Sequence, residues 1–476
     1  QFVVQLLYPK PGHVEIDPDE LWRIIVKVIK TTIEESGIKP ESIVCLGIST
    51  QRGSFTTWNM KDGRHYHNFI TWKDLRADDM VKEWNSSLTM KGLRIGSQIL
   101  YTLSRRKRFL AASVFKFMNT QVRVLHFNLY INKHFRHAAN NGNAVFGGVD
   151  CWLLYKLTGL LNSVEQHVTD VSSASATGIF DPFTMTWSSV LINLLKLPYN
   201  IFPEVVDTTG EFGVLSKEVF GVEIPILCSM ADQSASMFGS GSTQPGDLKI
   251  TMGTGTFVNV NTGTKAHASV TGLYPVIGWG IGDELAYVVE GASNDTGVLV
   301  EWFVSGIIND ASETSSIASA VNDSDGVYFV PAFSGLQAPI NDYSAATGFV
   351  GIKPTTEKSH IVRSLLESIV YRILLIYESL CTETCFTYRK IRVDGGVSTN
   401  NFVLQLLADL TGLDVERATS TEMSILGVTF LAGLQCDVLK LRKIETIFES
   451  NEENRLRYQP IIAQWKRAVE RLGQWY

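Results

Sequence analysis

The segment IPILCSMADQSA, residues 224–235, contains the pattern that decides the fold class. Residues 224–230 form a short, mostly apolar run of the kind found in strands buried on both faces, and polar residues follow at once. The segment IVCLGISTQRG, residues 43–53, repeats this pattern. Polar residues at the carboxyl end of a buried strand are where α/β proteins bind ligands. Asp232 therefore has two interpretations, a general base that faces a cleft or the N-cap of the next helix.

Helical and strand patterns alternate along the rest of the chain. The sequence DPDELW at 17–22 is typical of a helix start, because an acidic cap and a proline precede apolar residues at helical spacing. A helix is also predicted at about 359–378, and a strand at 390–393. This alternation predicts an α/β architecture with mostly parallel sheets. The composition changes near residue 240, which predicts two domains, at 1–240 and 241–476.

Two glycine-rich turns are candidates for phosphate binding. Residues 248–260 have apolar flanks around the sequence GTG at 253–255, which predicts a β-hairpin with a tight turn. Glycines let backbone amides approach an anion closely, but a plain hairpin turn is the simpler explanation of this pattern. The sequence DGG at 394–396 follows a strand and precedes a helix. Its amides either meet a nucleotide at the helix N-terminus or form an ordinary βα turn.

The composition excludes several classes of protein. With 476 residues, 45% of them hydrophobic and 19% charged, the chain is typical of a folded protein with more than one domain. Its net charge of −6 provides no footprint for nucleic acid. No window holds the ~18 apolar residues that a membrane span needs. Because the six cysteines are scattered and lie mostly in apolar stretches, we expect a reducing compartment, the cytoplasm.

The motifs of several common enzyme classes are missing from the chain. The nine histidines have no spacing typical of a metal site, so any Mg²⁺ is expected to arrive with a nucleotide. There is neither a P-loop nor a nucleophile elbow, which disfavours P-loop nucleotidases and α/β hydrolases. Residues 51–76 combine Arg52 and Trp72 with other basic and aromatic side chains, a combination that suits a polyol.

The order of the motifs carries a resemblance over nearly the whole length of the chain. It resembles the FGGY carbohydrate kinases and, within them, the animal branch of the glycerol kinases. The first half contributes GHVEIDP at 12–18, STQR at 49–52, Trp72, FGGVDCWL at 146–153, TDVSSAS at 169–175 and ADQ at 231–233. The second half contributes MGTGTF at 252–257, VPAFSGLQAP at 330–339 and VDGGVSTNNF at 393–402.

The resemblance implies a fold and a reaction. It implies two actin-like (ribonuclease-H-like) α/β domains with an interdomain cleft that closes on MgATP and a small polyol, and it implies a homodimer. The reaction is the conversion of glycerol and ATP to glycerol 3-phosphate and ADP. Asp232 is the implied general base, and it also faces Mg²⁺ indirectly. The implied polyol contacts are Arg52, Trp72, Gln233 and Phe257, and the implied ATP contacts are Gly253, Thr254, Gly255, Gly395, Gly396 and Asn400.

The chain departs from the family pattern in three places. The family's magnesium loop, Asp-x-Gly-Thr-Thr/Ser, has no match, and Gln1 aligns well inside the family's first domain. We therefore expect a fragment whose first domain lacks its initial strands and which turns over little substrate by itself. Gly53 stands where glycerol kinases usually carry a Glu. At 121–129 the chain reads QVRVLHFNL, where the family has a helix and a Tyr that contacts the polyol. These departures leave two alternatives, an FGGY kinase for another sugar and a non-catalytic nucleotide- or partner-binding protein.

Overall fold

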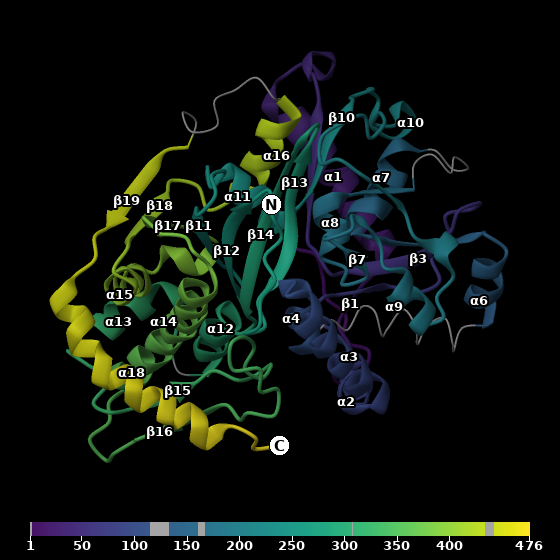
Figure 1. Cartoon of the computed structure of the whole chain (residues 1–476). Helices are drawn as coiled ribbons and strands as arrows, with labels where there is room; N and C mark the ends of the chain where they lie inside the picture. Colours follow the sequence, from purple (N-terminus) through teal and green to yellow (C-terminus); the bar gives the residue numbers. More distant parts are fainter. Residues whose placement is uncertain (1, 115–132, 160–166, 307, 434–441) are drawn as a thin grey trace. The chain divides into compact units, whose positions relative to one another are not determined.

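The computed structural model describes residues 2–114, 133–159, 167–306, 308–433 and 442–476. The segment at 121–129 that departs from the family pattern lies outside these residues. The chain forms two compact units that interleave along the sequence. Unit 1 comprises Gln1–Ser236, Val276–Tyr287 and Ser424–Cys436, and unit 2 comprises Met237–Pro275, Val288–Met423 and Asp437–Tyr476. Figure 1 shows the elements of both units along the chain.

A pair of parallel strands in unit 1 confirms the pattern that opened the sequence analysis. β2 (Leu46–Thr50) pairs with β10 (Ile226–Ala231), and Ala231 lies opposite Thr50. Because the two strands run in the same direction and end in register, the residues that follow them emerge side by side. These residues are the polar turn at 51–53 and Asp232 at the start of α11 (Asp232–Gly239).

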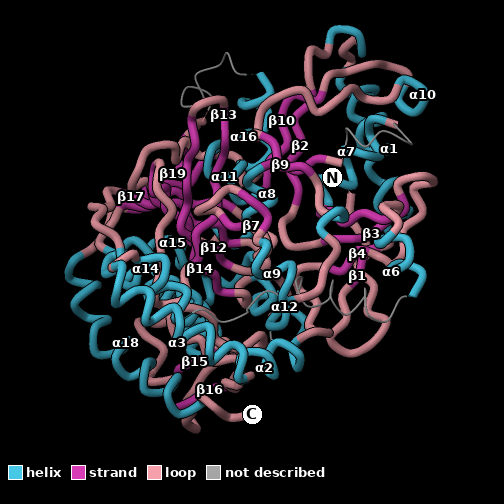
Figure 2. The backbone as a smooth tube through the Cα atoms, turned by 45° about the vertical axis from the view of Figure 1, so that its right-hand side comes forward, coloured by secondary structure: helices cyan, strands magenta, loops and turns pink. Residues whose placement is uncertain are grey.

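The other main sheet of unit 1 is antiparallel. Its strands β1 (Glu15–Ile16), β4 (Phe69–Ile70), β3 (Phe55–Asn59) and β5 (Ala144–Gly148) are neighbours in this order, as Figure 2 shows for β1, β3 and β4. The prediction of mostly parallel sheets is therefore wrong here. The reason is that only residues 60–68 separate β3 from β4, whereas a parallel pair needs a crossover of about a dozen residues or more.

Helices cover these strands. α1 (Pro18–Ser36) begins as predicted, because the Asp17 carboxylate accepts a hydrogen bond of 2.8 Å from the Asp19 amide. α7 (Val149–Thr158) is buried over nearly its whole length, which fits its mostly apolar sequence, although Asp150 is among its buried residues. The remaining helices are α2 (Asp78–Ser86), α3 (Leu88–Ser104), α4 (Lys107–Val114), α6 (Lys133–Asn140), α8 (Val171–Ser175), α9 (Ser189–Leu194), α10 (Lys217–Phe220) and α16 (Met423–Gly433). Short strand pairs are β6 (Val168–Asp170) with β9 (Glu204–Val206), and β7 (Phe180–Asp181) with β8 (Thr186–Trp187).

Unit 2 is built around a mixed sheet. Its neighbours in order are β14 (Glu284–Ser293), β12 (Thr256–Gly263), β11 (Leu248–Met252), β17 (Lys390–Asp394), β18 (Asp414–Ala418) and β19 (Ile444–Phe448). β11 and β12 form the predicted hairpin, and β11, β17 and β18 run parallel. β13 (Tyr274–Ile281) lies mostly within unit 1, and β15 (Tyr328–Val330) pairs with β16 (Gly348–Val350).

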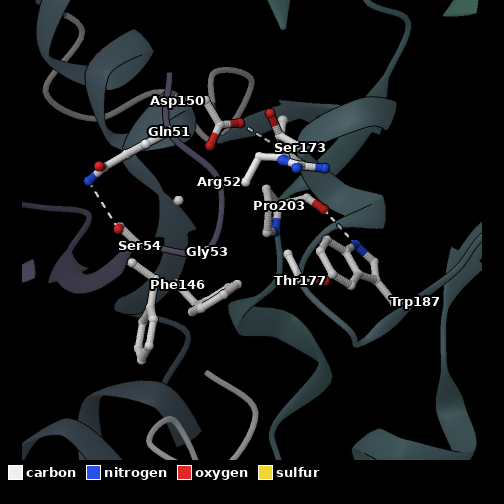
Figure 3. Close-up of a pocket in the computed structure, with 13 residues that line it drawn as sticks. Gln51, Arg52, Gly53, Ser54, Phe146, Asp150, Ser173, Thr177, Trp187 and Pro203 are labelled. Atoms are coloured by element: carbon white, nitrogen blue, oxygen red, sulfur yellow. Dashed lines mark hydrogen bonds between the residues drawn. The ribbon is translucent and has the colours of Figure 1, made fainter. Parts of the chain in front are cut away.

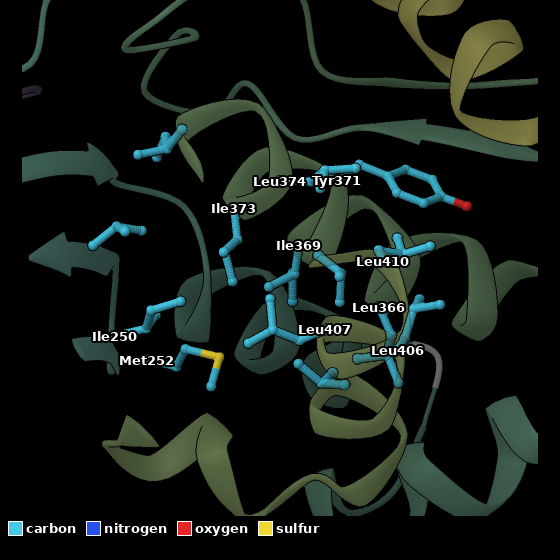
Figure 4. Packing of buried hydrophobic residues seen from close by; sticks show 14 of the residues in the cluster. Ile250, Met252, Leu366, Ile369, Tyr371, Ile373, Leu374, Leu406, Leu407 and Leu410 are labelled. Atoms are coloured by element: carbon cyan, nitrogen blue, oxygen red, sulfur yellow. The ribbon is translucent and has the colours of Figure 1, made fainter. Parts of the chain in front are cut away.

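The core of unit 2 lies between this sheet and its helices. α14 (Lys358–Glu383) confirms the predicted helix and packs beside α13 (Thr314–Ser319) and α15 (Asn401–Thr411), as Figure 1 shows. Figure 4 shows Ile250 and Met252 from β11 facing side chains of α14 and α15. α12 (Gly297–Gly306) and α18 (Glu452–Leu472) complete the unit. Of the helices that the structure describes, none combines the length and the apolar character that a membrane crossing requires.

Candidate active site

Asp232 and Arg52 meet at the carboxyl ends of β10 and β2. The Arg52 Nε lies 3.6 Å from the Asp232 Oδ1, and the Asp232 Oδ1 accepts a hydrogen bond of 2.8 Å from the Gln233 amide. The Arg52 side chain is 10% exposed and the Asp232 side chain is 37% exposed. Asp232 is the first residue of α11, so this bond to the next amide is not the N-cap bond that the sequence left open. Its carboxylate bonds an amide at the start of α11, and it remains accessible enough to meet a substrate.

The other predicted polyol residues of unit 1 lie beside this pair. The Ser54 hydroxyl accepts hydrogen bonds from the Trp72 amide, at 3.2 Å, and from the Gln51 Nε2, at 3.0 Å, so it ties Trp72 to the turn that carries Arg52. Gln233 is 8% exposed, and its Oε1 forms no hydrogen bond with any described residue. A buried acceptor without a donor costs about 1–3 kcal/mol, which a substrate hydroxyl would offset. Phe257 is half-buried in β12 of unit 2.

A pocket adjoins Arg52 within unit 1. Its volume is about 20 Å³, which is room for no more than a few water molecules, and Figure 3 shows the side chains around it. Its lining combines polar and aromatic side chains, a combination that suits a small polyol. The polar members are Gln51, Arg52, Ser54, Asp150, Thr169, Ser173 and Thr177, the aromatic members are Phe55, Phe146 and Trp187, and Gly53, Gly148 and Pro203 complete the lining.

Asp150 is the functional candidate that sequence reasoning missed. It lies at the start of α7 and is 3% exposed, and its Oδ2 accepts a hydrogen bond of 2.5 Å from the Thr169 hydroxyl. Burial raises the pKa of Asp150 to about 6, against the opposing effect of the Thr169 bond. The available signal was an acid inside an otherwise apolar run, at 146–153. That run contributed to the family resemblance, but none of its residues received a role.

The two glycine turns of unit 2 pack directly against each other. They follow β11 and β17, which are parallel neighbours with Thr251 opposite Asp394. Gly395 has a φ of 88°, and a Cβ atom on it would lie 2.5 Å from the Met252 carbonyl oxygen. Only a residue without a side chain permits this approach. No atom lies within 4 Å of the corresponding position on Gly396, which leaves space in front of that turn.

The hairpin turn at Gly253, Thr254 and Gly255 is fixed by its carbonyl groups. The Gly253 amide donates to the Gly255 carbonyl, at 3.0 Å, and the Gly253 and Thr254 carbonyls accept hydrogen bonds from the amides of Gly297 and Thr296. Both bonds come from the segment at the start of α12. The contacts between the turn and the start of α12 therefore use carbonyl oxygens of the turn as acceptors.

Asn400 has a clear role in the fold. Its Oδ1 caps α15 by accepting a hydrogen bond of 3.1 Å from the Val403 amide, and its Nδ2 donates to the Thr314 hydroxyl at 2.9 Å. The side chain therefore links α15 to α13 beside the Gly396 turn. A contact between Asn400 and ATP stays a prediction.

The described residues contain no group of three or more His, Cys, Asp or Glu side chains that could hold a metal ion.

Comparisons with known proteins place the chain in a family. The N-terminal domain of the FGGY family of carbohydrate kinases matches residues 1–239, and the C-terminal domain matches residues 248–436. The chain is 46% identical over 488 residues to glycerol kinase 5 of Danio rerio, an alignment that covers 99% of this chain and 91% of the relative. The chain belongs to the FGGY family of carbohydrate kinases. The predicted boundary at 240 falls between the two matched ranges.

Other FGGY kinases agree with this assignment. Glycerol kinase 2 of Thermotoga maritima is 38% identical over 480 residues, covering 98% of this chain and 92% of the relative. The structure is similar to that of Plasmodium falciparum glycerol kinase with ADP, with a TM-score of 0.84 and 27% identity over 99% of this chain and 92% of that one. The fold is therefore the two-domain, actin-like α/β fold that the sequence predicted. The absence of the initial strands of its first domain stays a prediction.

Proposed function

We propose that the protein transfers the γ-phosphoryl group of ATP to a primary hydroxyl of glycerol or a similar small polyol, which yields glycerol 3-phosphate and ADP from glycerol. The observation that carries this proposal is the position of Asp232 beside Arg52 at the carboxyl ends of β10 and β2, in a chain of the FGGY family. The glycerol kinases among its relatives support glycerol as the first substrate to test.

The residues of unit 1 would bind and activate the polyol. Asp232 accepts the proton of the attacking hydroxyl while the new oxygen–phosphorus bond forms, and the ion pair with Arg52 orients its carboxylate. Gln233 presents its buried Oε1 to a substrate hydroxyl. The ring of Trp72 offers an apolar surface to the carbon chain. The Lys73 Nζ lies 5.4 Å from the centroid of this ring.

The glycine turns of unit 2 fit the phosphates of a nucleotide. Gly395 and Gly396 keep side chains away from this site, and the space in front of Gly396 admits an anion to the backbone amides. Gly253, Thr254 and Gly255 are the neighbouring candidates, and Asn400 holds the helix that starts there. When bound, ATP supplies the electrophilic phosphoryl group. We propose that Asp232 interacts with Mg²⁺ only indirectly, because the described residues form no metal-binding group of their own.

The experiment that tests this function measures both products. The protein is incubated with MgATP and glycerol, and ADP and glycerol 3-phosphate are quantified together, with a parallel titration of ADP by calorimetry. Equal amounts of the two products are expected. ADP binding without any phosphorylated polyol would contradict the proposal and favour the non-catalytic alternative. Phosphorylation of a ketose in place of every polyol would favour a kinase for another sugar.

We further propose a cytoplasmic homodimer. Five cysteines lie in the described part of the chain, all as free thiols, and Cys381 and Cys385 are exposed, which suits a reducing compartment. Light scattering on the purified protein tests the homodimer, and fractionation of cells tests the compartment.

A further inference from the structure

We propose that α3 and α4 of unit 1 bind the surface of a lipid bilayer that contains anionic lipid, with α3 lying in the plane of the interface. This inference goes beyond the proposed function and does not depend on it, because neither helix contributes a residue to the candidate active site. It assigns a role to a basic and amphipathic part of the chain that the proposed reaction leaves unused.

One face of α3 is apolar and exposed. Of its 17 residues, only Met90 is buried. Four apolar residues recur at intervals of seven, four and four residues, which places them on one side of the helix, opposite Met90. Each of them is at least 55% exposed, and they are Leu88, Ile95, Ile99 and Leu103. We call these four residues the apolar stripe.

The described residues leave the apolar stripe uncovered. Gly92 lies on the same side of α3, between Leu88 and Ile95. Apart from its chain neighbours and the backbone of α3 itself, no atom lies within 4 Å of the position that a Cβ would occupy on Gly92, and the same holds for Gly96. The helices in contact with α3 are α2 and α4, which Figure 1 shows next to it. Apolar side chains exposed over several turns indicate a surface that binds a partner.

The same part of the chain is strongly basic. Residues 88–114 contain no Asp or Glu, and the nearest acidic residues along the chain are Glu83 and Asp150, although the whole chain has a net charge of −6. Lys91 lies beside the apolar stripe, because it follows Leu88 by three residues and precedes Ile95 by four. The other basic residues of 88–114 are Arg94, Arg105, Arg106, Lys107 and Arg108.

The basic run at 105–108 directly follows the apolar stripe. Arg105 ends α3 in a left-handed conformation, with a φ of 55°, and its amide donates a hydrogen bond of 2.7 Å to the Tyr101 carbonyl. Arg105, Arg106 and Arg108 are exposed, and none of them forms an ion pair with a residue that the structure describes. Their charges are therefore available to an anionic partner at the end of the stripe.

A bilayer with anionic lipid matches both properties of this surface. Helices that lie in a membrane interface bury apolar side chains at the boundary of the acyl chains and direct Lys and Arg toward anionic headgroups. The apolar stripe would make the first kind of contact, and the basic run would make the second. Nucleic acid offers phosphates to the basic run but leaves the stripe in water. A second copy of the chain would cover the stripe but would bring like charges together.

Vesicles of two compositions test this inference on the unaltered protein. Flotation compares vesicles of phosphatidylcholine with vesicles that also contain about 30% phosphatidylserine. We expect at least about tenfold tighter binding to the anionic vesicles, because each Lys or Arg near an anionic surface raises the affinity about fivefold. Salt at about 0.5 M should weaken this binding, because it screens the charges. Equal binding to both kinds of vesicle, or binding to neither, would overturn the inference.

A triple variant identifies the basic run as the anionic-lipid contact. Arg105→Gln, Arg106→Gln and Arg108→Gln together should weaken binding to the anionic vesicles by about 100-fold. The matched control changes the net charge by the same amount at three exposed lysines elsewhere, with the substitutions Lys217→Gln, Lys265→Gln and Lys358→Gln. The control should bind vesicles like the parent protein. An equal loss of binding in both triple variants, or in neither, would overturn the inference.

A double variant tests the apolar stripe. Ile99→Gln with Leu103→Gln keeps every basic residue and should weaken binding to the anionic vesicles at least about tenfold, because the apolar contact is lost. Both positions are exposed, so thermal unfolding should match that of the parent protein. Parent-like vesicle binding by this variant would overturn the role of the stripe.

Two other outcomes would replace the bilayer with a different partner and so overturn the inference. The first is a parent protein that binds no vesicles and forms a dimer in light scattering that Ile99→Gln with Leu103→Gln abolishes, which would make this face an interface between copies. The second is tighter binding to a nucleic acid duplex than to the anionic vesicles. All these variants should phosphorylate glycerol at the parent rate, so the vesicle assays and the phosphorylation assay separate a failure of this inference from a failure of the proposed function.

Discussion

The Lys249 Nζ lies 3.0 Å from the Asp394 Oδ1, and the two side chains are 0% and 4% exposed. This buried ion pair joins β11 to β17 immediately before the two glycine turns. Lys249 also donates a hydrogen bond to the hydroxyl of Thr251, on its own strand. The charges therefore fix the register of the two strands whose ends form the proposed nucleotide site.

Replacing Lys249 alone should lower the free energy of unfolding more than replacing both Lys249 and Asp394. Lys249→Met leaves a buried carboxylate without its cation, and we expect a loss of about 3–5 kcal/mol in the free energy of unfolding. The double variant Lys249→Met with Asp394→Asn removes both charges and should lose less. Urea unfolding followed by circular dichroism measures both. A single variant no less stable than the double would contradict this role of the pair.

Alanine at Gly395 should destabilise unit 2, and alanine at Gly396 should not. A methyl group on Gly395 meets the Met252 carbonyl and requires a left-handed backbone, which costs about 1–3 kcal/mol for the conformation alone. Gly396 has open space at the same position, so it is the matched control for stability. Thermal unfolding compares the two variants, and equal midpoints would show that the close approach of the turns is unimportant.

The stability of the fold should depend on pH through Asp150. Burial, and secondarily the nearby Asp170 carboxylate, raise the pKa of Asp150 to about 6. Asp170 is itself fully buried with a raised pKa.

The raised pKa of Asp150 sets the direction in which its contribution to folding stability changes with pH. Because the folded pKa lies above the ordinary value of 3.8, Asp150 contributes its full stability below that value and loses the contribution as the pH rises through about 6. The difference in unfolding free energy between Asp150→Asn and the parent protein should therefore shift in favour of the variant across this window. Chemical unfolding at several pH values measures it.

Glu383 should stabilise unit 2 in a pH-dependent way. Burial alone would raise the pKa of this carboxyl, but hydrogen bonds from His267, Ser269 and the Val270 and Thr271 amides lower it to about 2. Because the folded pKa is below the ordinary value of 4.5, the contribution is present above that value and is lost as the pH falls through about 2. Glu383→Gln should cost about 1.5–3 kcal/mol at neutral pH.

Unfolding midpoints of Glu383→Gln and the parent protein, at neutral pH and in acid, test this prediction. The two midpoints should converge in acid. A difference that is as large in acid as at neutral pH would mean that the charge of Glu383 is not what stabilises the segment at 267–271.

Local patterns predicted the elements that carry the proposed reaction. The apolar runs before residues 51 and 232 became β2 and β10, and the glycine-centred pattern at 248–260 became a hairpin, because a buried strand and a tight turn each leave a local signature. Lys249 left no such signature, and Asp150 left only an acid inside an apolar run, which did not indicate a role. Each is a charged residue in a strand or helix pattern, and its importance depends on a partner, Thr169 or Asp394, that only the folded chain brings near it.

The antiparallel sheet of unit 1 could not be predicted from local sequence patterns either. β3 pairs with β5 across more than eighty residues, and no local pattern in either strand specifies a partner at that separation. The pocket wall depends on this pairing, since Gly148 at the end of β5 lies opposite Phe55 and leads directly into Asp150.

The phosphorylation rate of the Asp232→Asn protein tests the central claim most directly. ADP formation with glycerol is measured for the parent protein, for Asp232→Asn and for the control Asp79→Asn, which lies on the exposed surface of α2, with ADP affinity measured in parallel. We predict that Asp232→Asn lowers the phosphorylation rate by about 10²–10⁴-fold and leaves the affinity for ADP unchanged. The control Asp79→Asn should keep the rate of the parent protein. An Asp232→Asn protein that retains most of the parent rate would contradict the role of this carboxylate as the base.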